Sequence, residues 1–116
     1  MKCMKITTPE LLAIDLLDRS ICRVEVSAVL SDASGIYSWG WNFQGLDGLG
    51  CHAEIHAIMR ANRKRLNGST ITIAGRRRKS GNAVCSLPCM ECMSAIVRNH
   101  IHRIEYRDKN GDWYAV

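Results

Sequence analysis

The chain has 116 residues, of which 47% are hydrophobic and 23% charged, a balance typical of a globular domain and not of a disordered segment. Sixteen Lys and Arg residues against eleven Asp and Glu residues give a net charge of +5, which permits a polyanionic partner but does not require one. No apolar run approaches the roughly 20 residues of a membrane span, and Asp15 interrupts the apolar stretch at residues 11–17, which makes it a poor signal-peptide core. We therefore expect one domain over residues 1–116, located in the cytoplasm and without a membrane partner.

The first half of the chain predicts a helix and then two strands. Apolar residues at helical spacing follow Thr8, a helix-capping residue type, and predict an amphipathic helix that ends near residue 17. Alternating Val24 and Val26 predict a strand over residues 22–30, and turn-forming residues at 32–35 lead to a second strand over 36–42. Three glycines within residues 43–50 predict a loop.

The second half of the chain alternates helices and strands before a final hairpin. The predicted segments are a helix over 52–66, a strand over 69–75, a basic polar loop over 76–88, a helix over 89–99, and strands over 104–107 and 113–116. Asn67-Gly68 is a typical helix end, and Lys109-Asn110-Gly111 is a typical hairpin turn. This order predicts an α/β fold in which a five-stranded mixed sheet lies between two layers of helices, with a C-terminal β-hairpin.

Two predicted helix starts carry side chains that can bind a metal. His52-Ala53-Glu54 opens one helix, and Pro88-Cys89-Met90-Glu91-Cys92 opens the other. Cysteines three residues apart lie on one face of a helix, and a position in the first turn favours the thiolate form. One imidazole and two thiolates would hold Zn²⁺ with a fourth position open to water, whose pKa then falls toward about 7.

Glu54 distinguishes a catalytic zinc site from a structural one. Residues i and i+2 of a regular helix point to different faces, so His52 and Glu54 can share a site only if His52 lies at the helix cap. Glu54 would then reach the water and move its proton without binding the metal.

The spacing of H-x-E followed by P-C-x-x-C is the signature of zinc-dependent nucleobase deaminases. On these residues, and on the order of its helices and strands, most of the chain resembles the cytidine/deoxycytidylate deaminase superfamily. The resemblance implies that His52, Cys89 and Cys92 bind one zinc per chain. It also implies that a zinc-bound hydroxide attacks C4 of cytosine, with Glu54 as the proton shuttle, to give uracil.

The resemblance also suggests where the substrate binds and which branch of the superfamily is closest. Asn42 matches the place of an asparagine that binds the sugar in that superfamily, and Ala53 lies within the first motif, where we expect substrate contact. The C-terminal hairpin is similar to that of the cytidine deaminase branch. That branch, however, usually has cysteine where this chain has His52, so the branch stays open.

Three other interpretations of the motif residues remain. Cys85 or Cys51 could complete a closed structural zinc site. His52 and His56 are spaced as in a zinc protease, but the glutamate is not adjacent to the first histidine as that motif requires. A non-catalytic zinc module that binds partners is the third, and Glu54 argues against it.

The substrate class depends on residues outside the motif. Residues 76–79 are all basic, so Arg78 could hold the phosphate of a nucleotide or of a nucleic-acid backbone. Trp41 alternates with Trp39 and could stack a base, although such tryptophans also pack in cores. We expect a free cytidine or deoxycytidine nucleoside or nucleotide as substrate, with single-stranded DNA or RNA as the alternative. A homo-oligomer is possible.

Overall fold

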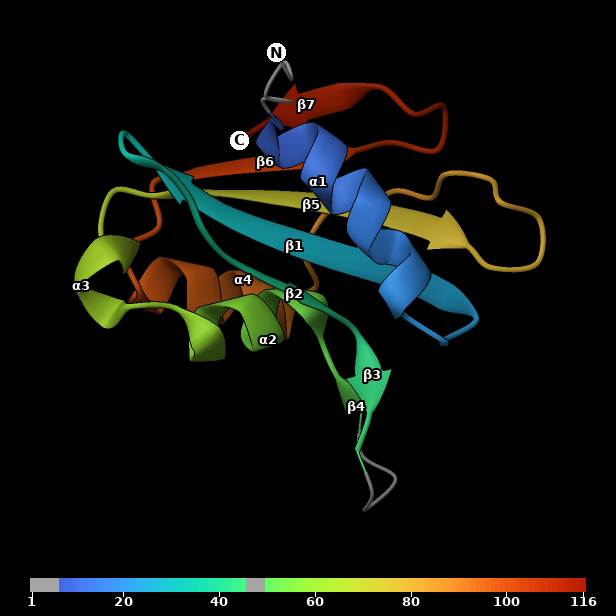
Figure 1. Cartoon of the computed structure of the whole chain (residues 1–116), viewed down its shortest axis with the longest axis horizontal. Helices are drawn as coiled ribbons and strands as arrows, with labels where there is room; N and C mark the ends of the chain where they lie inside the picture. The colour runs from blue at the N-terminus through green and yellow to red at the C-terminus, as the bar shows by residue number, and fades with distance from the viewer. Residues whose placement is uncertain (1–6, 46–49) are drawn as a thin grey trace, which may run out of the picture.

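The computed structural model describes residues 7–45 and 50–116, and a five-stranded mixed sheet forms its centre (Figure 1). The strands are β1 (Val24–Asp32), β2 (Gly35–Trp41), β5 (Thr70–Arg77), β6 (Arg103–Arg107) and β7 (Trp113–Ala115), in the spatial order β2-β1-β5-β6-β7. β5 and β6 pair in parallel, whereas the other neighbouring strands pair antiparallel. The predicted mixed sheet and the C-terminal hairpin of β6 and β7 are confirmed.

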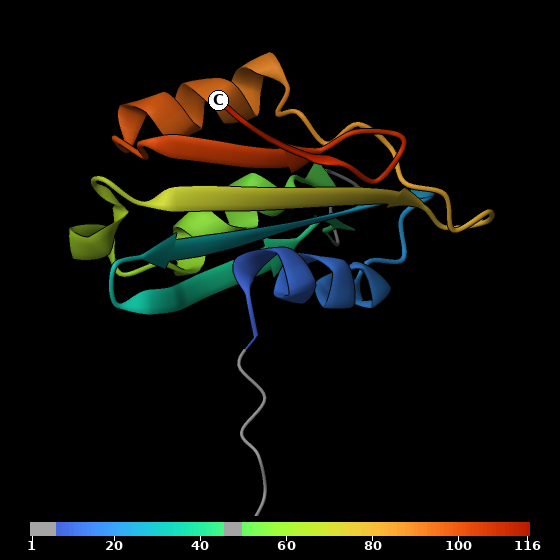
Figure 2. The same cartoon turned by 90° about the horizontal axis from the view of Figure 1, so that it is seen from above.

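Helices cover both faces of the sheet. α1 (Pro9–Leu16) and the 3₁₀ turn η1 (Leu17–Arg19) lie on one face, and α2 (Ala53–Arg60) and α4 (Met90–Arg98) lie on the other (Figures 1 and 2). Alternation along β1 supplies both layers of the core, because successive side chains of a strand point to opposite faces. Val29 packs against α1, while Ala28 and Leu30 pack against the layer that contains α2 and α4. The predicted three-layer α/β/α arrangement is confirmed.

The N-terminus of α1 follows the sequence prediction. The Thr8 side chain accepts a hydrogen bond from the backbone N–H of Leu11 at 3.2 Å, which satisfies one of the free donors of the first turn.

Within the described residues, no helix is long and apolar enough to cross a membrane.

The prediction of one helix over residues 52–66 is wrong, because the segment breaks into α2 and a short helix α3 (Arg63–Leu66). Ala61 and Asn62 adopt extended backbone angles. The side chain of Asn62 accepts a hydrogen bond from Lys64 N–H at 3.1 Å, so this asparagine starts a new helix as an N-cap.

Two further predicted boundaries change. The segment 43–50, predicted as a loop, contributes to a two-stranded ladder of β3 (Phe43–Gln44) and β4 (Gly50–Cys51). Residues 46–49 of this segment lie outside the described residues. β5 is longer than predicted and includes two residues of the predicted basic loop, because Glu25 pairs with Arg76 and Val24 with Arg77 in the ladder with β1. The charged side chain of Arg76 is stabilised there by ion pairs to Glu25 at 2.7 Å and Asp18 at 2.8 Å.

Candidate active site

The start of α2 presents His52 and Glu54 to the same cavity. His52 is the N-cap residue, with φ −75° and ψ 148°, so its backbone is extended and the helical geometry that would separate it from Glu54 begins only at Ala53. Glu54 follows in the first turn and retains only 5% of its exposed surface. Both residues line one cavity of about 350 Å³.

The start of α4 brings two thiols to His52. Cys89 is the N-cap of α4, again with an extended backbone, and Cys92 lies in the first turn. The Nδ1 atom of His52 is 3.1 Å from Cys92 Sγ and 3.6 Å from Cys89 Sγ, and the three ligand atoms all lie within 4.8 Å of one another.

These side chains fit zinc by their donor set and by their spacing. Zinc–sulfur distances of about 2.3 Å and zinc–nitrogen distances of about 2.1 Å in a tetrahedron place neighbouring ligand atoms roughly 3.6 Å apart. The separation of His52 Nδ1 from Cys89 Sγ, 3.6 Å, equals that value, and its separation from Cys92 Sγ, 3.1 Å, is somewhat shorter. Among the described residues, no fourth His, Cys, Asp or Glu side chain joins this group, so three protein ligands leave one coordination position for a small molecule.

Burial makes the bare site unfavourable for negative charge. Burial, with Glu54 and Cys89 beside it, raises the pKa of the Cys92 thiol far above its usual range. Burial likewise raises the pKa of Glu54, partly opposed by its own backbone N–H, by His52 and by Cys92. A bound divalent cation reverses this effect for the thiol, because a coordinating thiol is deprotonated. The negatively charged forms of these side chains are therefore favoured in this site only when a cation is bound.

The cavity has a second wall made by the strands. Val24 and Val26 of β1 line it, together with Cys22, just before β1, and Asn42, just after β2. The Asn42 side chain joins the end of β2 to β1: its Oδ1 accepts hydrogen bonds from Ser20 Oγ at 2.6 Å and Val26 N–H at 2.9 Å, and its Nδ2 donates to the Val24 carbonyl at 2.8 Å. Among the residues that the structure describes, the second Nδ2 hydrogen of this amide has no acceptor.

Ser86 is a residue of this site that the sequence analysis missed. Its buried hydroxyl donates to the Ile73 carbonyl at 2.7 Å and accepts from the backbone N–H of Arg107 at 2.9 Å. These bonds fix the segment before Pro88 against β5 and β6, and thereby hold Cys89 over the cavity. Its position two residues before the P-C-x-x-C motif was the available signal.

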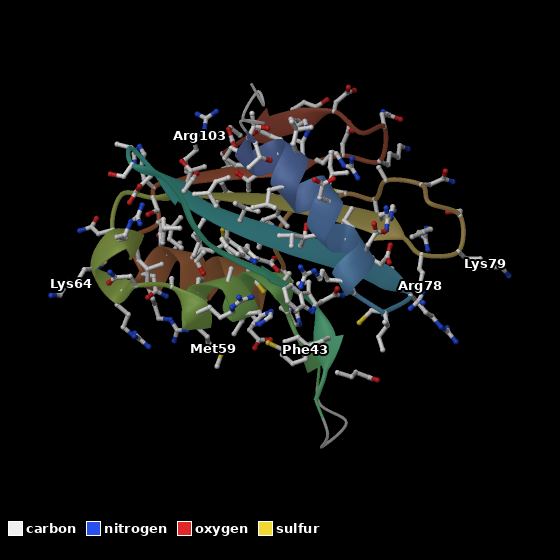
Figure 3. The ribbon with its side chains drawn as sticks, in the orientation of Figure 1. Phe43, Met59, Lys64, Arg78, Lys79 and Arg103 are labelled. Atoms are coloured by element: carbon white, nitrogen blue, oxygen red, sulfur yellow. The ribbon has the colours of Figure 1, made fainter. Side chains whose placement is uncertain are left out.

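Of the remaining predicted residues, some line the cavity and others lie away from it. Ala53 is fully buried and lines the cavity. Trp41 and Arg78 do not line it: Trp41 packs against the α1 layer, and Arg78 lies in the turn after β5, at the edge of the molecule (Figure 3). Cys51 and Cys85 line the cavity but do not belong to the ligand cluster.

His56 is a structural residue of α2 and not a ligand. Its Nδ1 lies 3.1 Å from the Trp41 carbonyl oxygen and 3.2 Å from the Trp41 backbone nitrogen. Its ring makes edge contacts with the rings of Trp41 and Phe43, both at 4.9 Å between centres. The spacing of a zinc protease is thus not used for metal binding here.

The family model of the cytidine and deoxycytidylate deaminase zinc-binding region matches residues 10–107. The chain belongs to this family. The match includes the three clustered ligands and Glu54, so the zinc-binding region of this deaminase family and the geometric metal site coincide.

Solved structures of cytidine deaminases share the fold of this deaminase-family chain. The cytidine deaminase of Burkholderia pseudomallei aligns with a TM-score of 0.70 and 16% identity over 93% of this chain and 88% of that chain. The E47D mutant cytidine deaminase of Mycobacterium tuberculosis aligns with a TM-score of 0.55 and 18% identity over 80% of this chain and 75% of that chain. No curated protein sequence gave a significant match to the chain. At these identities the structural likeness establishes the fold.

Proposed function

We propose that this protein is a zinc-dependent hydrolytic deaminase that converts the cytosine of a cytidine or deoxycytidine nucleoside or nucleotide to uracil. The observation that carries the proposal is the placement of the buried Glu54 carboxyl beside the His52, Cys89 and Cys92 ligand atoms. A structural zinc site needs no such carboxyl group, because it is closed by its four ligands.

The metal has one role in the proposal. His52, Cys89 and Cys92 would hold the zinc, which would supply a water activated for nucleophilic attack near neutral pH. The two thiolates balance the charge of the cation.

Glu54 moves the protons of the reaction. Its carboxylate accepts one proton from the water that adds to C4 and gives it to N3. It then accepts the second proton, from the hydroxyl now on C4, and gives it to the amino group, which leaves as ammonia. Water and cytosine are thus converted to uracil and ammonia.

The cavity suits one nucleoside. Its volume of about 350 Å³ lies near the lower end of the range for small-molecule sites. Val24 and Val26 offer an apolar surface to the base, and the Ala53 backbone and the remaining Nδ2 hydrogen of Asn42 are the polar groups that we assign to the substrate.

The experiment incubates zinc-loaded protein in parallel with cytidine, deoxycytidine and the monophosphate of each. It measures the ammonia and the corresponding uracil compound that are formed. We expect turnover of at least one cytosine compound and none of the corresponding uracil compound. Absence of product from all four, with zinc bound, would contradict the proposal. A homo-oligomer remains part of the proposal, and light scattering of the same preparation measures it.

A further inference from the structure

Ser20 lies behind the wall of the catalytic cavity and makes contacts that the proposed chemistry does not use. It is only 2% exposed, and it does not line the cavity itself. Its hydroxyl donates to Asn42 Oδ1 at 2.6 Å, because an amide oxygen cannot donate, and accepts from the backbone N–H of Cys22 at 3.2 Å. Asn42 and Cys22 both line the cavity. Ser20 is therefore one residue removed from a ligand bound there.

Asn42 continues the pairing of β2 with β1 beyond the last residue of β2. Its backbone N–H donates to the Val26 carbonyl at 3.0 Å. Its Oδ1 accepts from the Val26 N–H at 2.9 Å, and its Nδ2 donates to the Val24 carbonyl at 2.8 Å. A backbone N–H can only donate and a carbonyl can only accept. These contacts therefore hold the side-chain amide in one orientation at the cavity wall.

Ser20 limits what this amide offers to a ligand. The oxygen of an amide has two lone pairs, and its nitrogen carries two hydrogens. The Val26 N–H and the Ser20 hydroxyl occupy both lone pairs of Asn42 Oδ1. The Val24 carbonyl takes one Nδ2 hydrogen, and within residues 7–45 and 50–116 the other hydrogen has no acceptor. Toward a ligand, Asn42 is thus a donor only.

The hydrogen bonds through Ser20 all run in one direction. The Cys22 N–H donates to Ser20, and the Ser20 hydroxyl donates to Asn42, whose Nδ2 group ends the chain as a donor. Hydrogen bonds in such a chain polarise and strengthen one another. Ser20 therefore makes the remaining N–H of Asn42 a better donor, which suits an oxygen atom that can accept.

We infer that Ser20 is a positioning residue, which saturates Asn42 Oδ1 and so directs the Nδ2 donor of Asn42 to a hydroxyl on the sugar ring of the substrate. The inference rests on the proposed function, which holds the base at Glu54 and the ligand cluster and leaves the sugar for Asn42. Ser20 acts through Asn42 and touches no part of the substrate.

The experiment measures the Kd of cytidine and of 2′,3′-dideoxycytidine by isothermal titration calorimetry. It uses zinc-loaded Glu54→Gln protein, so that neither nucleoside is consumed. In this background, Ser20→Ala should raise the Kd of cytidine by about three- to tenfold, the usual worth of one hydrogen bond. The Kd of dideoxycytidine, which has no hydroxyl on the sugar ring, should change by less than about twofold.

Two further variants separate the hydrogen bond from packing. Ser20→Cys keeps a similar side-chain volume but offers only a weak donor, so it should also raise the Kd of cytidine by about threefold. Ser38→Ala is the matched control, because it removes another buried serine hydroxyl, which donates to the Ala57 carbonyl at 2.8 Å away from the cavity lining. Both Kd values should stay within about twofold in this control. Thermal melts check that every variant is folded.

A second measurement needs no ligand. The side-chain amide resonances of Asn42 are assigned by their loss in Asn42→Ala. They should shift in Ser20→Ala and stay in place in Ser38→Ala, because only the first change removes a donor to Oδ1.

Three results would overturn the inference: an equal rise of both Kd values in Ser20→Ala, an unchanged Kd of cytidine in Ser20→Cys, or unshifted Asn42 resonances in Ser20→Ala. The first would mean that the sugar hydroxyls are not the groups recognised, and the second that Ser20 acts by packing. Failure of the proposed function is seen separately, as binding of neither nucleoside before any serine is changed. The Asn42 resonances then decide the positioning role of Ser20 by themselves.

Discussion

The two walls of the catalytic cavity are held in different ways. The strand wall is complete by itself, because the Asn42 side chain bonds to Ser20, Val24 and Val26 and joins β1 to β2. The ligand wall, formed by His52, Cys89 and Cys92, places three metal-binding atoms together. Burial there raises the pKa of the Cys92 thiol instead of favouring its ionised form.

The difference shows what each wall contributes. The strand wall fixes the shape of the cavity through the fold alone, so it should persist without a metal. The ligand wall brings together groups that are stable in that arrangement only when a cation offsets their burial, so its stability should depend on zinc.

The largest expected effect follows from breaking the ligand wall. Cys89→Ala should lose the zinc and all measurable deamination. At a free zinc concentration about 1,000 times the Kd of the unmodified protein, the free energy of unfolding of the variant should be lower by about 4 kcal/mol. Elemental analysis and thermal unfolding with and without a chelator measure this. Cys85→Ala is the control, because Cys85 lines the same cavity outside the ligand cluster. Full zinc retention by Cys89→Ala would contradict the ligand assignment.

Removal of the proton carrier should leave both walls in place. Glu54→Gln should keep its zinc and its fold but lower kcat by about 10⁴-fold or more, because general acid–base catalysis is worth about 10²–10⁴-fold per transfer and Glu54 serves several transfers. Steady-state kinetics and zinc content measure the two properties. Asp15→Asn, an exposed carboxylate-to-amide change on α1 at the other face of the sheet, should be neutral. Loss of zinc by Glu54→Gln would instead make Glu54 a ligand.

The strand wall should be broken by Asn42→Ala whether or not zinc is present. The change leaves the Val26 N–H and the Val24 carbonyl without their partner, which should cost about 2–3 kcal/mol of unfolding free energy. Denaturant unfolding of zinc-loaded and chelated protein measures the loss, which should be the same in both. Asn67→Ala, at an exposed helix end, is the control. If Asn42 also binds the sugar, KM rises in the variant; unchanged stability would contradict its structural role.

The smallest effect is expected far from both walls. Arg65 forms two bonds to Asp32, at 2.7 and 2.8 Å, and holds the pKa of Asp32 below its usual value. A lowered folded-state pKa adds stability above the unfolded value of about 4 and loses it as pH falls through the folded value. Asp32→Asn should therefore be less stable than the unmodified protein at pH 7, and this difference should vanish in strong acid. Thermal melts from neutral to acid pH measure it; a constant difference would contradict the ion pair.

The sequence predicted the elements that depend on local pattern. Thr8 marked the start of α1, and alternating valines marked β1. The prediction failed at residues 61–62, where the helical pattern of apolar residues continued but Asn62 capped a new helix. It also failed at Arg76, where a basic run suggested a loop although the residue pairs with Glu25 across the sheet. The first error arises because a helical pattern of apolar residues does not exclude a local cap within it. The second arises because local composition does not report on a partner distant in the sequence.

By itself, the sequence determined the chemistry of the site: an imidazole, two thiols and a glutamate at fixed spacing in two segments 37 residues apart. Only the tertiary structure decided that both segments begin their helices at one cavity, with His52 and Cys89 as the N-caps. It also decided that Asn42 faces that cavity while Trp41 and Arg78 do not. The physical reason is that residue type and spacing fix what a side chain can bind, whereas the direction of a side chain depends on strand pairing and on the packing of helices against the sheet.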